Sequence, residues 1–236
     1  MKIPKKITPD NIKEAIVQVK FEPSCAPELV LGIFNRICSD LLEFVSGKVV
    51  KEEKPSIIIE NNEGGFFIDK SSLFKIDVNG NSITFNTQSD SYPGWNEYFD
   101  FIESIINKCV ENSLFLKIER IGVRYISHFD DITIFDKLKV DISVPFTSIN
   151  DSTQFRSEFK YKDHRVILTI LNYITNKSKE GEIKTSVIDI DVIKQVDSNS
   201  YSCNISECIE ASHFAQKEIF FNLLSEDFLE GLKPEY

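Results

Sequence analysis

The chain has 236 residues, of which 27 are basic and 37 acidic, so its formal net charge is -10. Hydrophobic residues make up 42% and charged residues 27%, which is typical of a globular protein and excludes a disordered or collagen-like chain. No apolar run reaches the roughly 18 residues of a membrane span, and no apolar stretch follows the basic N-terminus as in a signal peptide. The five cysteines are scattered and odd in number, which is typical of reduced thiols, so we expect a cytoplasmic protein with no membrane association.

The first half of the chain is predicted to run strand, helix, short strands, helix. Alternation of apolar and polar residues over 14–21 predicts a strand. Pro23 and Pro27 then open a helix whose apolar side chains follow helical spacing and which ends at Gly47. Short strands are expected at residues 56–59, 65–69, 74–78 and 82–87. Asn79-Gly80 predicts a type I′ hairpin turn between the last two strands, because that turn needs positive φ at both central residues.

The second half repeats this order. A strand is predicted over residues 121–129 and a short helix around 132–138. Three longer strands follow at residues 153–161, 165–175 and 183–194, with Asp163-His164 and the polar run 176–181 as their turns. The last helix is expected to begin at Asn204, where Glu207 completes a capping-box arrangement, and to end near Leu224.

This last helix carries an apolar stripe that should pack on the sheet. The stripe consists of Ile205, Cys208, Ile209, Ser212, Ala215, Ile219, Leu223 and Leu224. Four charged residues lie elsewhere on the helix and are expected to face solvent: Glu207, Glu210, Lys217 and Glu218. His213 lies off the centre of the stripe, so we expect a hydrogen-bonded structural histidine and not a catalytic base.

These patterns predict an α+β fold, with one or more antiparallel sheets and helices packed on one face. The common order of the two halves, and the match of their inward faces when Phe21 is aligned with Phe129, predict two tandem β-α-β(meander)-α pseudo-repeats. The N-terminal pseudo-repeat would cover residues 1–116 and the C-terminal one residues 117–236. Because neither group of strands has enough apolar surface for a core of its own, the two should form one continuous globular unit.

Four local motifs occur together along the chain. They are Asn11–Ile16 (NIKEAI), Tyr92–Trp95 (YPGW), Arg120–Ile126 (RIGVRYI), and His213 with Phe220 in the last helix. In their order and spacing they resemble an uncharacterised, sporadically distributed family of bacterial and archaeal proteins of about this length. Asn11 and Ser127 depart from that family's pattern. The sporadic distribution implies horizontally transferred genes, and hence a place in toxin–antitoxin or antiviral defence systems.

The central motif supplies the first candidate site. Arg120, Arg124 and Tyr125 lie on the predicted central strand, and a guanidinium group is suited to binding carboxylate or phosphate. The alternative is a structural ion pair between Arg124 and Glu14, which occupies the equivalent strand of the first half. We favour the structural alternative over a ligand site.

The second candidate is Trp95, beside the Pro-Gly turn that precedes the second helix. An exposed tryptophan is typical of a binding hot spot. The alternative, which we favour, is that this aromatic side chain closes the end of a sheet.

A third candidate is a modest basic ribbon on the strand that begins at Thr153. Its basic residues are Arg156, Lys160 and Lys162, with Arg165 across the turn. A solvated sheet face is the simpler interpretation, and a surface for nucleic acid or an acidic partner is the other. The segment from Asp163 to Glu182-Ile183-Lys184 superficially resembles a metal-dependent nuclease motif, but acid-x-Lys triplets arise by chance in a lysine-rich chain.

The sequence contains no hydrolase triad, metal-ligand cluster or phosphate-binding loop, so no cofactor or metal is expected. We therefore predict a non-enzymatic protein-interaction or recognition subunit, antitoxin-like or accessory to phage defence, that binds a protein partner or forms a homodimer. The alternative is a nucleic-acid-binding module or, ranked lower, a metal-dependent nuclease. The net negative charge disfavours nucleic acid as the partner.

Overall fold

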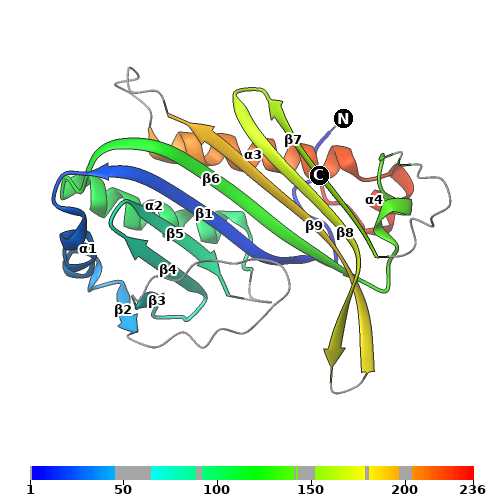
Figure 1. The fold of residues 1–236 in the computed structure, drawn as a ribbon, viewed down its shortest axis with the longest axis horizontal. Coiled ribbons are helices and arrows are strands. Elements are labelled where there is room, and N and C mark those ends of the chain that lie inside the picture. The colour runs from blue at the N-terminus through cyan, green and yellow to red at the C-terminus, as the bar shows by residue number, and fades with distance from the viewer. Residues whose placement is uncertain are drawn as a thin grey trace. The chain divides into compact units, whose positions relative to one another are not determined.

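Nine strands form one sheet in the computed structural model, which describes residues 2–45, 65–88, 92–140, 142, 152–178, 181–196 and 204–236 (Figure 1). The strands are β1 (Ile12–Pro23), β2 (Leu42–Val45), β3 (Phe66–Asp69), β4 (Phe74–Asn79), β5 (Ser82–Thr87), β6 (Phe115–Asp130), β7 (Thr153–Tyr161), β8 (His164–Ser178) and β9 (Gly181–Gln195). They are hydrogen-bonded in the order β2-β3-β4-β5-β1-β6-β9-β8-β7. The prediction of an α+β fold built on an antiparallel sheet is confirmed. The predicted strand at residues 56–59 lies outside the described residues.

Six helical segments accompany the strands in the described residues. They are η1 (Pro27–Leu29), α1 (Val30–Cys38), α2 (Trp95–Glu111), η2 (Ile134–Lys137), α3 (Ile205–Leu223) and α4 (Glu226–Gly231), with η1 and η2 being 3₁₀ turns. In the part of the chain that the structure describes, no helix combines the length and the apolarity needed to cross a bilayer.

The chain divides into two compact units. Unit 1 comprises Met1–Val17 and Arg120–Tyr236, and unit 2 comprises Gln18–Glu119. The first residues join the C-terminal half because their backbone is hydrogen-bonded to it: the Lys5 amide donates to the Glu235 carbonyl at 2.6 Å, and the Thr8 amide to the Leu232 carbonyl at 2.7 Å. The sequence pattern instead divides the chain between residues 116 and 117.

Unit 2 has a core rich in aromatic side chains. The ring of Phe34 on α1 packs edge-on against Phe67 on β3, and the hydroxyl of Tyr98 on α2 donates to the Phe85 carbonyl of β5 at 2.8 Å. The buried thiols of Cys38 and Cys109 are hydrogen-bonded, and this bond together with burial raises the pKa of Cys109. Both helices are thus fixed to strands of their own unit by buried groups.

The first helix is shorter than its apolar spacing predicted. Helix α1 ends at Cys38, and residues 42–45, which were expected to continue the helix, form strand β2. The buried stripe is Val30, Phe34 and Cys38, whereas Leu29 is 57% exposed. The helix ends early because β2 pairs with β3, and this pairing is invisible to a local pattern.

The predicted β4–β5 hairpin is present, but its turn is not of type I′. The strands close at the pair Asn79–Ser82, so the loop residues are Gly80 and Asn81. None of residues 79–81 has φ in the left-handed region. The side-chain oxygen of Asn79 instead accepts a hydrogen bond from the Asn81 amide at 3.1 Å, which is an Asx turn.

Unit 1 is built on long strands, of which β6 and β9 pair in an unbroken register. Strands β6 and β9 pair from Asp130–Thr185 to Arg120–Gln195 without a slip. Alternation along them directs one set of side chains into a core shared with β8, η2, α3 and α4. In Figure 1, α3 runs behind β6 and β9, so the helices of this unit leave the other face of these strands open.

A bulge interrupts the β8–β9 pairing between Leu171 and Ile174. At the bulge the buried side-chain oxygen of Asn172 accepts from the Ile134 amide and from the Ser186 hydroxyl, both at 3.0 Å. Tyr173 has φ of 55°, a conformation that non-glycine residues rarely adopt. Beyond the bulge the two strands continue as a hairpin to Ser178 and Gly181, so the polar run predicted as a turn is mostly strand. Hydrogen bonds between the backbones of β8 and β9 continue the strands through this segment, and these bonds do not depend on the polarity of the side chains.

Helix α3 packs against β9 through most of the predicted stripe. Six of its eight residues are buried, and Ile219 and Leu223 are partly buried against the same core. The stripe also includes Phe220 and Phe221, which the prediction left out. Glu207 and Glu210 face solvent as predicted, but Glu218 does not, since its side chain is only 18% exposed and contacts Lys162.

The predicted caps and three of the four described thiols agree with the structure. The Asn204 side chain accepts from the Ser206 amide at 3.1 Å, and the Ser225 hydroxyl caps α4 by accepting from Phe228 at 3.3 Å. Cys25, Cys38 and Cys109 are free thiols. Cys208 is disulfide-bonded, which corrects the prediction that all cysteines are reduced, because spacing alone does not report thiol pairing. Cys203 lies outside the described residues.

Phe221→Ala should lower the free energy of unfolding by about 3–5 kcal/mol, because it leaves a cavity in the unit 1 core. For a chain of this size the melting temperature should fall by roughly 10 °C. Asn222→Ala is the matched control, since the neighbouring side chain is exposed; it should change the melting temperature little. Equal effects of the two substitutions in a thermal melt would contradict the packing of α3 described above.

Candidate functional site

The candidate site is the open face of the unit 1 strands, opposite the face that packs on α3. Register places five basic side chains on it: Arg120, Arg124, Arg156, Lys160 and Arg165. Four carboxylates share the same face: Glu14, Glu158, Asp189 and Asp191. We refer to these nine residues and the strand surface between them as the charged face. The sheet thus brings together five of the eight predicted site residues.

The strongest interaction on the charged face joins Arg124 on β6 to Asp189 on β9. The guanidinium donates two hydrogen bonds, from Nε at 2.8 Å and from Nη2 at 2.6 Å, to the two carboxylate oxygens. The Arg124 side chain is 25% exposed and that of Asp189 is 16% exposed. A bidentate pair with this little solvent contact positions β6 relative to β9. Of the two alternatives for Arg124, the structural ion pair is therefore present, but its partner is Asp189 and not Glu14.

Asp191 lies directly across from Arg124 in the β6–β9 register. Burial raises the pKa of Asp191, and the nearby charge of Asp189 raises it further, while Arg124, Arg120 and Arg165 lower it. Arg120 pairs across the strands with Gln195, two positions further along the same face. The two arginines of the central motif thus both lie beside Asp191.

The predicted basic ribbon on β7 and β8 is largely neutralised by carboxylates. Arg165 donates to both oxygens of Glu158, from Nε at 2.5 Å and from Nη2 at 2.9 Å, and this contact lowers the pKa of the Glu158 carboxyl. Arg156 lies on the same face of β7, and its charge lowers that pKa further. Arg156, Lys160 and Arg165 are exposed, so the ribbon offers mixed charge to solvent.

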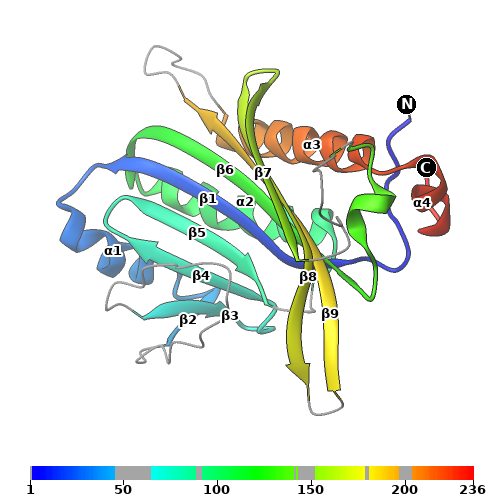
Figure 2. The same cartoon turned by 45° about the vertical axis from the view of Figure 1, so that its right-hand side comes forward.

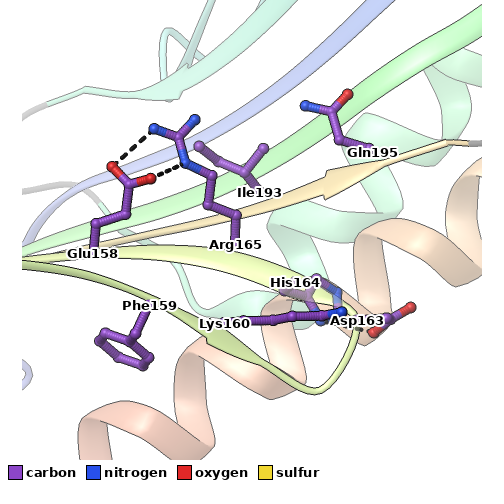
Figure 3. Close-up of a pocket in the computed structure, with 8 residues that line it drawn as sticks. All are labelled: Glu158, Phe159, Lys160, Asp163, His164, Arg165, Ile193 and Gln195. Atoms are coloured by element: carbon purple, nitrogen blue, oxygen red, sulfur yellow. Dashed lines mark hydrogen bonds and ion pairs between the residues drawn. The ribbon is translucent and has the colours of Figure 1, made fainter.

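A hollow of about 410 Å³ lies at the end of the β7–β8 hairpin (Figure 3). In the figure the Glu158–Arg165 pair lies on one side of the hairpin, and Phe159 points to the other. His164 lines the hollow but is only 2% exposed, and burial lowers its pKa. Its Nδ1 lies 3.0 Å from an oxygen of Asp163, whose other oxygen lies 2.9 Å from Lys194 Nζ. Angles at the ring prevent a hydrogen bond at that distance. This cluster was not predicted, because His164 was expected in a turn.

Tyr125 lies on the opposite, helix-facing side of β6. It is 3% exposed, and its hydroxyl lies 3.2 Å from Nδ1 of His213 on α3. Burial lowers the pKa of His213 to about 3, so the imidazole is neutral at physiological pH. The pair therefore connects α3 to the central strand, and His213 has the structural role predicted for it.

Lys162 and Trp95 also lie away from the charged face. Lys162 occupies the β7–β8 turn with φ of 54°, forms an ion pair with Glu218 of α3, and lies over the rings of Tyr161 and Phe214. Trp95 belongs to unit 2, where its half-buried ring stacks on Phe99 with centroids 5.3 Å apart. Both side chains are used in local packing.

The nuclease-like motif is not assembled. Asp163 precedes the first residue of β8, whereas Glu182 pairs with Lys177 near the last. At the rise of an extended strand these positions are roughly 45 Å apart. Within the described ranges no group of three or more His, Cys, Asp or Glu side chains is placed to hold a metal ion.

Comparison with protein-family models gives no match to this chain, and comparison with curated proteins gives none either.

Arg124→Ala should lower the free energy of unfolding by about 2 kcal/mol, because it leaves the Asp189 carboxylate without its bidentate partner in a poorly solvated position. The expected fall in melting temperature is several degrees. Arg36→Ala, which removes an exposed arginine of helix α1 outside the charged face, is the matched control and should melt like the wild type. If Arg124→Ala leaves stability unchanged and abolishes binding of a partner instead, the structural role assigned to Arg124 is wrong.

The low pKa of His213 makes stability depend on pH. Because folding lowers the pKa of His213, the unfolded state binds the proton at a higher pH than the folded state does. The stability that the neutral imidazole contributes is therefore complete above about pH 6.5 and is lost as the pH falls toward 3. Between about pH 7 and pH 5 the wild type should lose roughly 2 kcal/mol through this residue. His213→Gln should show a correspondingly smaller decrease in melting temperature over the same interval. Identical pH profiles would show that His213 is not buried as a neutral group.

Proposed function

We propose that this chain is a non-enzymatic recognition subunit that binds a protein partner through the charged face of unit 1. The observation that carries the proposal is the pairing of charges on that face. Arg124 is matched by Asp189 and Arg165 by Glu158, each through two hydrogen bonds. A surface whose charges are paired presents a fixed pattern of both signs, which specifies a complementary protein surface.

The same pairing disfavours nucleic acid as the partner. Five basic groups share the charged face with four carboxylates, so the excess of positive charge is a single unit. Affinity for nucleic acid depends on neutralising several phosphates with unpaired lysine and arginine side chains. The chain as a whole carries a net charge of -10, which adds long-range repulsion.

Half-exposed apolar side chains lie among the charges. Ile167, Thr169 and Leu171 on β8 alternate with buried core residues and share the face with Asp189 and Asp191. Apolar surface rimmed by polar groups is the usual composition of a protein interface. This combination supports a partner that is a folded protein or an extended segment of one.

Two further parts of the proposal concern origin and context. The two halves share the order strand, helical segment, strands, helix, and in each the first strand lies beside the last strand of its meander, β1 beside β5 and β6 beside β9. This symmetry supports an origin by tandem duplication. Membership of the sporadically distributed family, a cytoplasmic location and a role in antiviral defence or a toxin–antitoxin pair stay predictions from the sequence.

Affinity purification from the source cells tests the proposed function. The wild-type chain should recover a protein partner, and Thr169→Glu, which adds a charge at the centre of the charged face, should lose that partner. Because Thr169 lies opposite Asp189, a thermal melt of the variant must show that it still folds. Asn222→Glu on the exposed side of α3 is the matched control and should retain the partner. Recovery of the same proteins with both variants would contradict recognition through this face.

A second measurement addresses the alternative partner. Fluorescence anisotropy with single- and double-stranded oligonucleotides should show no binding at about 50 mM salt, where electrostatic binding is strongest. Binding that weakens steeply toward about 200 mM salt would replace the protein partner with nucleic acid.

A further inference from the structure

Strand β7 forms one margin of the sheet. It pairs with β8 over its whole length, from Thr153–Asn172 to Tyr161–His164, and no strand of the described residues pairs with its other side (Figures 1 and 2). Its nine residues contain neither proline nor a bulge. Natural proteins commonly protect such an edge, because its free amides and carbonyls can pair with another strand.

The hairpin geometry shows which backbone groups point to the open edge. Lys162 and Asp163 form a two-residue loop, so the flanking pair Tyr161–His164 is the closing, hydrogen-bonded pair. Hydrogen-bonded pairs alternate along an antiparallel ladder. The odd-numbered residues of β7 therefore bond to β8, and the even-numbered residues present their amides and carbonyls to the edge. These residues are Gln154, Arg156, Glu158 and Lys160.

The sequence of β7 is complementary to itself about Ser157. In an antiparallel pair of two copies centred on Ser157, Arg156 of each copy lies opposite Glu158 of the other. Phe155 of each lies opposite Phe159 of the other, on the alternate face. Because of the two-fold symmetry, each of these pairs occurs twice in the dimer. Oppositely charged pairs and aromatic pairs across two strands are among the side-chain pairs that stabilise a sheet.

The backbone parity agrees with this register. Arg156 and Glu158 are even-numbered, so their backbone amides and carbonyls point to the open edge. These are the backbone groups that would form hydrogen bonds between the two copies in this register. Phe159, one of the larger exposed hydrophobic side chains at 36%, would be covered by its aromatic partner. Glu158 would lie between Arg165 of its own chain and Arg156 of the second copy.

Neighbouring registers are disfavoured by charge. A two-fold centre at Arg156 places that guanidinium opposite itself, and a centre at Glu158 places carboxylate opposite carboxylate and Arg156 opposite Lys160. A centre displaced by two residues, at Phe155 or Phe159, shortens the paired segment. Only the centre at Ser157 pairs all nine residues without opposing like charges.

We propose that a second copy of this chain pairs with the first through β7, antiparallel and centred on Ser157, so that the sheet continues across a two-fold axis. The dimer is formed by the edge of β7, and of the charged face only Arg156, Glu158 and Lys160 take part in it, so it does not depend on the function proposed above. The dimer would place the charged faces of both copies on the same side of the extended sheet.

Charge reversal with mutual rescue tests the dimer. Sedimentation equilibrium of the wild-type chain should show a monomer–dimer equilibrium. Arg156→Glu and Glu158→Arg should each weaken self-association by about tenfold or more, because each places two like-charged pairs at the interface. An equimolar mixture of the two variants should restore association, since Glu at 156 of one variant then faces Arg at 158 of the other, and the native pair forms at the second position.

Matched controls separate contact from net charge. Lys117→Glu and Glu210→Arg change the net charge by the same amounts at exposed positions away from the edge and should dimerise like the wild type. Thermal melts should confirm that all the variants fold. A wild-type chain that stays monomeric, single variants that associate as strongly as the wild type, or a mixture that fails to restore association would each overturn the proposed register.

Discussion

The structure of unit 1 depends on the fixed register of its long strands. Alternate side chains of a strand point to opposite faces, so a slip of one residue between β6 and β9 would direct Arg124 into the core and Val123 into solvent. The bidentate contact between Arg124 and Asp189 opposes such a slip, because it forms only when the two strands are aligned as observed. A poorly solvated ion pair adds little net stability compared with apolar residues of equal volume. We therefore infer that the role of the Arg124–Asp189 pair is to determine the register of the two strands.

Separation of the two faces leaves the unit with two surfaces of different chemistry. The helix-facing side is closed by α3, whose Tyr125–His213 contact and aromatic side chains complete the core. No helix of the described residues of unit 1 covers the charged face (Figure 1), and four of its nine charged residues form two bidentate pairs within the sheet. The edge strand β7 adds a third kind of surface, made of backbone groups, where Arg156 and Glu158 determine which strand can pair. The edge shares Arg156, Glu158 and Lys160 with the charged face, so association with a second copy leaves the other six residues of that face available to a partner.

Most strands could be predicted from the sequence, because period-two alternation is a local signal. Strand β7 has the predicted bounds, and β1 and β6 include the predicted residues but are longer. The interactions that could not be predicted are those that need a neighbour. The partner of Arg124 is Asp189, some 65 residues away, and only the β6–β9 register brings them together. Helix α1 ends early because residues 42–45 pair with β3. Asn172 continues the inward-facing alternation of Val166, Leu168 and Ile170, and its partners Ile134 and Ser186 come from other elements. The five basic residues of the charged face were named from their types, but their partners were not predicted correctly, since Glu14 was expected to pair with Arg124 and Asp189 does so.

Amide hydrogen exchange along β7, measured as a function of protein concentration, tests the account most directly. The odd-numbered amides, which bond to β8, should be protected at every concentration. The amides of Gln154, Arg156, Glu158 and Lys160 should exchange rapidly in dilute solution, because the edge is open, and should become protected as the concentration rises. Protection of these four amides in dilute solution would show that the edge is covered within one chain. Rapid exchange at all concentrations would show that the edge never pairs, and either result would contradict the account.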